Sequence, residues 1–150
     1  MVCDIHTHVE QQDSDGTWRR VEWPGAERHG SGPFDWSNYG LFAFFAGVRN
    51  YSAVPPLAEP RGLPADVSSS LLAESRDTDF HSHSWLSVAE LAGFDYAQTF
   101  EDRREGGMTV ARGVRTTYRA FLGAEFFRTL AALSSMNAVR PTRLVFWFDN

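Results

Sequence analysis

Apolar residues recur along the chain with two different periods, which predict strands at both ends and helices between them. Segments 2–10 and 17–23 have strand-like composition, and the polar segment between them closes on Asp15 and Gly16. This arrangement is typical of a β-hairpin. The apolar run 144–148 has the length of one strand. We therefore expect the N-terminal hairpin and the C-terminal strand to form a small, mostly antiparallel sheet.

Helical spacing of apolar residues predicts two main helices. Segment 37–48 is predicted to be a short buried helix that ends at Arg49 and Asn50. Segment 114–136 carries the longest apolar stripe and predicts one long C-terminal helix, with Asn137 as its C-cap. The stripe consists of Tyr118, Phe121, Leu122, Phe126, Leu130 and Leu133.

Shorter segments complete an α+β pattern. Ser87 and Glu90 have the spacing of a capping box, which predicts a short helix there, and segment 68–74 is predicted to add a helical turn. The glycine and proline residues of 24–34 favour an exposed loop, and the four prolines of 52–67 disfavour regular structure. The predicted fold is α+β: a small, mostly antiparallel sheet packed with one long C-terminal helix and short helices.

Composition narrows the possible functions. A length of 150 residues predicts a single domain, 1–150. The net charge of −5 argues against a protein that binds DNA or RNA polymers. All 14 basic residues are arginine, so lysine chemistry is excluded and each cation suits bidentate binding of phosphate or carboxylate. The single Cys3 and the short apolar run 41–48 favour a cytoplasmic protein without a membrane partner. The sequence is compatible with the formation of a homo-oligomer.

Histidine and carboxylate residues at alternate positions form the first candidate chemistry. Along the first strand such residues are Asp4, His6, His8 and Glu10, and the same spacing recurs at His81 and His83. In an extended chain, alternate residues share one face. Imidazole and carboxylate groups bind Zn, Mn and Fe and act as general acids and bases. A divalent metal would take its ligands from Asp4, His6, His81 and His83. Hydrogen-bonded structural roles explain the same spacing, and no cofactor is favoured.

Arginine and aromatic residues form the second candidate chemistry. If the long helix begins early enough, Arg112, Arg115 and Arg119 share a face. There they would either bind an anion or form ion pairs with nearby carboxylates. Arg49 and Arg61 are stronger candidates because binding residues collect in irregular segments. Aromatic residues that could stack on a base are Trp18, Trp23, Trp36, Tyr39, Tyr51, Phe80 and Trp85.

Five motifs are spread over nearly the whole chain. They are CDIH at 3–6, LFAFFAGVRN at 41–50, RGLPADVS at 61–68, HSHSWL at 81–86 and VFWFDN at 145–150. Together they resemble a family of small proteins encoded by tailed bacteriophages and prophages. The resemblance implies an accessory protein that acts in the host cytoplasm. It favours as ligand-binding residues His6, Arg49, Asn50, Arg61, His81, His83 and Trp85, ahead of His8, Glu10 and the stripe that starts at Arg112.

Three functions are compatible with these observations. The favoured one is counter-defence, in which the protein binds and sequesters a nucleotide-type immune second messenger, a cyclic oligonucleotide or a cyclic ADP-ribose species. Arginine would bind phosphate, aromatic residues the base, and polar side chains the ribose. The alternative is a metal- or histidine-dependent phosphodiesterase that cleaves such a nucleotide, its candidate catalytic residues being Asp4, His6, His81 and His83. A virion or protein-inhibitor component without a small-molecule ligand is the third.

Overall fold

The computed structural model describes residues 2–24 and 32–150, so most of the predicted loop 24–34 lies outside the described residues. The elements are β1 (Asp4–Gln12), β2 (Trp18–Val21), α1 (Tyr39–Ala46), α2 (Ser69–Glu74), β3 (His81–Ser87), α3 (Val88–Gly93), β4 (Thr99–Glu105), β5 (Met108–Thr117), α4 (Tyr118–Val139) and β6 (Thr142–Asp149). One sheet has the order β2-β1-β6-β3 and every pairing in it is antiparallel. The predicted α+β class is confirmed, as is the pairing of the N-terminal hairpin with the C-terminal strand.

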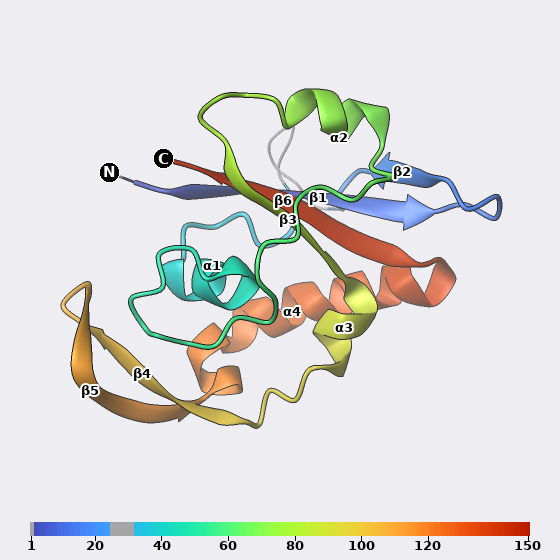
Figure 1. Ribbon diagram of the computed structural model, residues 1–150. Coiled ribbons are helices and arrows are strands. Elements are labelled where there is room, and N and C mark those ends of the chain that lie inside the picture. The colour runs from blue at the N-terminus through green and yellow to red at the C-terminus, as the bar shows by residue number, and fades with distance from the viewer. Residues whose placement is uncertain (1, 25–31) are drawn as a thin grey trace.

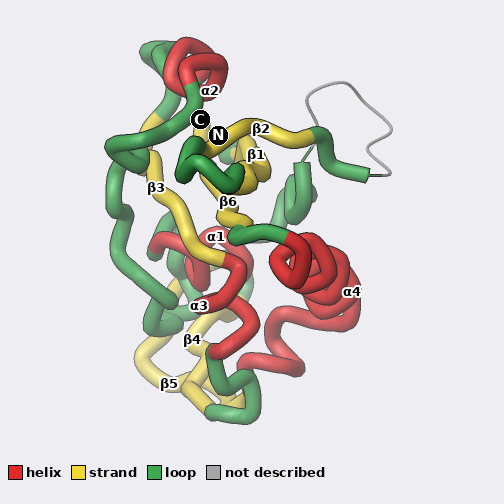
Figure 2. Tube along the Cα trace, turned by 90° about the vertical axis from the view of Figure 1, so that its right-hand side faces the viewer, coloured by secondary structure: helices red, strands yellow, loops and turns green. Residues whose placement is uncertain are grey.

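The four-stranded sheet lies between two unequal layers (Figures 1 and 2). Helices α1, α3 and α4 lie on one side, whereas α2 and the segments next to it lie on the other. The hairpin of β4 and β5 extends from the end of the helical layer, away from α2. Because β6 lies between β1 and β3, both of its edges are paired, and its side chains are buried in clusters on both faces of the sheet.

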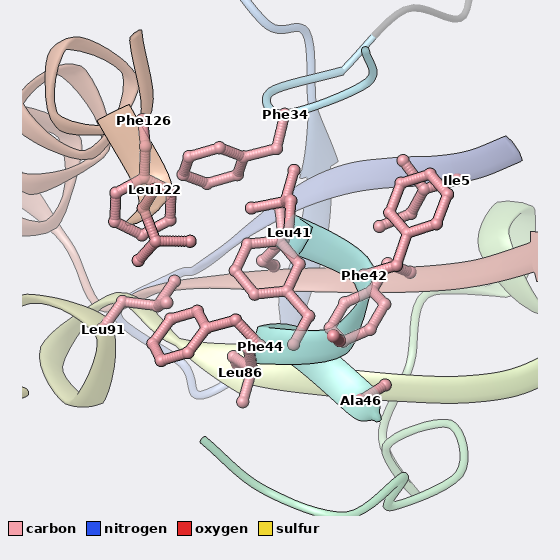
Figure 3. Packing of buried hydrophobic residues seen from close by; sticks show 14 of the residues in the cluster. Ile5, Phe34, Leu41, Phe42, Phe44, Ala46, Leu86, Leu91, Leu122 and Phe126 are labelled. Carbon is pink, nitrogen blue, oxygen red and sulfur yellow. The ribbon is translucent and has the colours of Figure 1, made fainter. Parts of the chain in front are cut away.

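The larger core fills the space between the sheet and the helical layer. Phe146 and Phe148 of β6 point into it, and the ring of Phe42 from α1 packs 5.2 Å from that of Phe148. The ring of Phe126 from α4 lies 5.1 Å from that of Phe34. Figure 3 shows side chains from α1, α4 and the sheet meeting there. Each fully buried phenylalanine contributes about 1.5–3 kcal/mol, so this core is the main source of stability.

The opposite face of the sheet carries the polar row that the sequence indicated on the first strand. Leu71 of α2 packs against Val145 and Trp147 of β6 and forms a second, smaller core. His8 and Glu10 of β1 lie on the same face and are buried with it. Alternation in β1 therefore separates two buried faces, and the polar one is covered by α2 and its neighbouring segments.

A buried ion pair joins β1 to β6 on this face. Arg143 Nε donates to Glu10 Oε1 over 2.9 Å, and the two side chains are only 6% and 0% exposed. A second guanidinium nitrogen of Arg143 donates to Asp66 over 2.8 Å. The remaining oxygen of Glu10 accepts the backbone N–H of Ser68 over 2.8 Å. The pair thus holds the segment before α2 against the middle of the sheet.

We expect Arg143→Met to destabilise the protein by about 3–5 kcal/mol, because it leaves the Glu10 carboxylate buried without its cation. The double variant Glu10→Met with Arg143→Met should lose less than the sum of the two single variants, with a coupling energy of up to about 3 kcal/mol. Urea denaturation of the four proteins measures this. Strict additivity would contradict direct coupling between the two groups.

His8 is a further buried titratable group of this face. Arg20 donates to His8 Nδ1 over 3.2 Å, so the neutral ring carries its proton on Nε2. The ring of Trp147 lies 4.7 Å away. Burial, aided by the charges of Arg20 and His6, lowers the pKa of His8 to about 3. His8 therefore stays neutral in the folded protein wherever an exposed histidine would be charged.

This lowered pKa predicts a loss of stability in acid. Between about pH 6.5 and pH 3 the unfolded chain binds a proton at His8 that the folded chain does not, so stability falls as the pH falls. From pH 7 to pH 5 this amounts to about 2 kcal/mol. We expect the variant His8→Gln to lose this part of the pH dependence, whatever its absolute stability. Chemical denaturation across this range provides the test, and an unchanged pH slope in the variant would contradict the assignment.

The hairpin of β4 and β5 was not predicted. It turns at Gly106 and Gly107, whose φ angles are +56° and +79°. Both angles lie in the left-handed region that glycine adopts without strain, as two-residue hairpin turns require. The strands are exposed over most of their length, and Phe100 is the buried anchor at their base. This exposure explains why no alternation of apolar residues marked them.

The predicted helix 114–136 was wrong at both ends. It begins at Tyr118, because the preceding residues form β5, and it runs to Val139, interrupted at Gly123 with a φ of +84°. The predicted C-cap, Asn137, lies inside the last turn, and Arg140 is the C-cap. The side chain of Asn137 instead accepts the backbone N–H of Thr142 over 2.9 Å.

The predicted arginine stripe does not form. Arg112 and Arg115 lie on β5, and only Arg119 lies on α4. Arg115 donates to Thr99 on the neighbouring strand over 2.9 Å, and the guanidinium of Arg119 lies 4.2 Å over the ring of Phe127. The helical face that would have joined the three cations does not exist.

The predictions for the shorter segments were more accurate. The capping box of Ser87 and Glu90 is present at the start of α3. Helix α2 occupies the predicted segment 68–74, and segment 52–67 contains neither helix nor strand. In the part of the chain that the structure describes, no helix is both long and apolar enough to cross a membrane.

Candidate functional site

The two histidines of the HSHSWL motif lie on opposite faces of the sheet. A bulge in β3 at Ser82, whose φ is +55°, shifts its register against β6. The ring of His81 lies 6.1 Å from that of Phe148, whereas the ring of His83 lies 5.6 Å from that of Trp147. Neighbouring residues of β6 point to opposite faces. The spacing of His81 and His83 therefore does not bring their rings together.

The polar row of β1 does not form a metal centre either. Asp4 is exposed, while His6 Nε2 lies 2.6 Å from Asp149 Oδ2. His8 and Glu10 are engaged with Arg20 and Arg143, as described above. Across residues 2–24 and 32–150, no group of three or more His, Cys, Asp or Glu residues could hold a metal ion.

Other predicted site residues have structural contacts. The guanidinium of Arg61 makes two hydrogen bonds to Glu90, of 2.6 and 2.8 Å, and lies 4.7 Å over the ring of Trp85. The side chain of Asn50 donates to Val54 O over 2.8 Å and accepts Val54 N–H over 3.0 Å. These contacts fix the segments that surround β3 and follow α1.

One hollow near the end of the sheet gathers arginine and tyrosine side chains from separate segments. Its lining residues are Tyr39, Arg49, Tyr51, Arg104 and Gly107, and its volume is about 510 Å³. We call it the Tyr–Arg hollow. Tyr39 begins α1, Arg49 and Tyr51 follow that helix, and Arg104 belongs to β4. The volume falls within the range of small-molecule sites, about 300–1,000 Å³.

Arg49 is held in place by its neighbours. Its guanidinium lies 5.7 Å over the ring of Tyr39 and donates to the hydroxyl of Tyr51 over 3.4 Å. It also donates to the side chain of Asn150 over 3.3 Å. Its own backbone has a φ of +51°, an uncommon conformation for a residue with a side chain. Such strain is often stored at functional sites.

Cys3 lies close to Arg49 but is unsuited to nucleophilic chemistry. It is fully buried, and its backbone N–H donates to the Tyr39 hydroxyl over 3.2 Å. Burial raises the pKa of the Cys3 thiol, although the contact with Arg49 partly opposes this. The thiol therefore stays protonated at neutral pH.

Arg104 contrasts with Arg49 in its freedom. It is exposed beside the glycine turn of the hairpin, and no carboxylate among the described residues forms an ion pair with it. Sequence reasoning missed this residue because it missed the hairpin. The signal was present in the Gly106-Gly107 pair between two polar segments, which is typical of a two-residue turn. The sequence indicates the two tyrosines only as members of a larger set of aromatic residues.

A second hollow adjoins the first. It is lined by Ser37, Asn38, Tyr39 and Arg104, and its volume is about 360 Å³. We call it the Asn38 hollow. Asn38 is the N-cap of α1, because its Oδ1 accepts the backbone N–H of Leu41 over 3.2 Å. Tyr39 and Arg104 are common to both hollows.

The function of this chain is inferred from the chemistry of the site. Comparison of the chain with protein families, curated proteins and solved structures found no match. The Tyr–Arg hollow combines permanent cations with aromatic faces. Guanidinium groups bind phosphate through charge-assisted hydrogen bonds, and aromatic rings stack on bases. The arrangement can therefore hold a ligand that has both groups.

Proposed function

We propose that this chain binds a small anionic nucleotide in the Tyr–Arg hollow. The observation that carries the proposal is the convergence of Arg49 and Arg104 with Tyr39 and Tyr51 around one hollow. The two guanidinium groups, one from the segment after α1 and one from β4, would bind phosphate from different parts of the chain. The tyrosine rings, whose centroids are 6.3 Å apart, provide a surface for a base.

The biological role that we propose for this binding is the sequestration of an immune second messenger. The resemblance of the five motifs to phage proteins implies a protein that acts in the host cytoplasm, and the net charge of −5 disfavours a polyanionic partner. The bound nucleotide would then be a cyclic oligonucleotide or a cyclic ADP-ribose species. Capture alone would remove such a signal, so no reaction is required.

Ligand capture can be measured by incubating the protein with a panel of linear and cyclic nucleotides and then denaturing it with heat. We expect depletion of at least one nucleotide and its recovery intact. Arg104→Ala should weaken binding about 10- to 100-fold, because a hydrogen bond to a charged group contributes about 1.5–3 kcal/mol. Arg49→Ala should do the same.

The matched control is Arg112→Ala, which removes an exposed arginine from the same hairpin but does not line the hollow. It should leave the affinity unchanged. If no nucleotide is depleted, or if all three arginine variants lose binding equally, the Tyr–Arg hollow is not the binding site.

The close contact of His6 with Asp149 supports a second candidate, a histidine-dependent phosphodiesterase. A carboxylate 2.6 Å from an imidazole nitrogen fixes the orientation of the ring. Both side chains are partly exposed, at 38% and 29%. Among the histidines that the structure describes, His6 is therefore the one best placed to act as a general acid or base.

The phosphodiesterase alternative predicts an altered nucleotide after incubation and a loss of turnover of about 10²- to 10⁴-fold in His6→Gln. The capture proposal predicts intact nucleotide with either protein. Chromatography of the heat-released ligand separates the two outcomes, with Asp149→Asn as a second variant that weakens the orientation of His6.

A further inference from the structure

We infer that the ligand is a dinucleotide, with one nucleoside in each hollow and the bridging phosphate at Arg104. This inference rests on the proposed nucleotide binding and adds the class of nucleotide. The Tyr–Arg hollow and the Asn38 hollow adjoin, with volumes of about 510 and 360 Å³. Each lies within the size range of a small-molecule site, about 300–1,000 Å³. Together they provide space for two units in one molecule.

Arg104 occupies the boundary between the two spaces. It is one of the two residues that line both hollows, the other being Tyr39. A cation shared by adjoining spaces can contact a negative group that links their occupants. Because the Arg104 guanidinium has no ion-pair partner among the described residues, a phosphodiester would meet it without displacing a carboxylate.

The two hollows differ in chemistry, which favours a linked ligand over two separate anions. Arg49 lines only the Tyr–Arg hollow, where it accompanies Tyr51. The Asn38 hollow instead has neutral polar groups beside the shared Arg104. It is therefore equipped for a second base or ribose more than for a second isolated phosphate.

Asn38 has a donor for that second unit. Its Oδ1 is committed to the N-cap, where it accepts Leu41 N–H, so its NH₂ group is the part of the amide that can donate to a ligand. The exposed hydroxyl of Ser37 adds a group that both donates and accepts. The first turn of α1 contains no acidic residue that would repel a nucleotide. Base carbonyls, ring nitrogens and ribose hydroxyls are the acceptors that suit this hollow.

The structure provides a sharp variant for testing this arrangement. Asn38→Asp preserves the cap, because aspartate and asparagine are equally good N-caps. It replaces the NH₂ donor with a carboxylate that would repel or fail to bind the second unit. Asn38→Ser also keeps a capping oxygen and removes the donor without adding charge. Thermal unfolding of both variants verifies that the cap is retained.

Calorimetric titration with 5′-mononucleotides, linear dinucleotides and cyclic dinucleotides of all four bases measures the preference. We expect the best dinucleotide to bind at least about 10-fold more tightly than the best mononucleotide. The ratio of these affinities should fall about 10-fold in Asn38→Asp and less in Asn38→Ser. Arg104→Ala should weaken dinucleotide binding, whereas Arg112→Ala should not.

Mononucleotide binding as tight as dinucleotide binding would overturn the inference while leaving the proposed nucleotide binding intact. A dinucleotide preference that Asn38→Asp does not reduce would overturn the assignment of the second unit to the Asn38 hollow. If no mononucleotide or dinucleotide binds, the proposed function itself fails, and the inference with it.

Discussion

The buried ion pair of Glu10 and Arg143 fixes how β1 and β6 pair, and the rest of the structure depends on that register. The two residues lie directly opposite each other, and Asp66 and Ser68 complete their hydrogen bonds from the segment before α2. A slip of one residue would turn Glu10 toward the phenylalanine core, where a carboxylate has no partner. At the other end of the same pairing, the chain after β6 brings Asn150 to Arg49.

The sequence predicts the parts of the fold where burial leaves a periodic pattern. Both terminal strands were identifiable because they are apolar or alternate strictly, and α3 because its capping box is local. The hairpin of β4 and β5 escaped because its side chains are mostly exposed, so no period of two exists. The same omission moved the start of α4, since Thr and Val residues of β5 were assigned to the helix.

The candidate site shows the same division between local pattern and tertiary context. Alternation correctly placed His6 and His8 on one face of β1, but it does not reveal that α2 covers part of this face. The bulge at Ser82 depends on pairing with β6, so spacing alone gave a false shared face for His81 and His83. Arg49 was predictable because it follows a helix in an irregular segment. That Arg104 lines the same hollow as Arg49 could not be predicted without first predicting the hairpin of β4 and β5.

The two outer strands of the sheet determine how the protein behaves when it is concentrated. β6 contains a continuous run of apolar residues of the kind that forms cross-β fibrils when exposed. It is enclosed, however, and β2 beside β1 has only four residues, two of them arginine. On β3, the bulge at Ser82 and the backbone hydrogen bond from Gly62 to His83 interrupt the outer edge. Short, charged and bulged edges resist the addition of another strand, so fibril formation would first require the sheet to open.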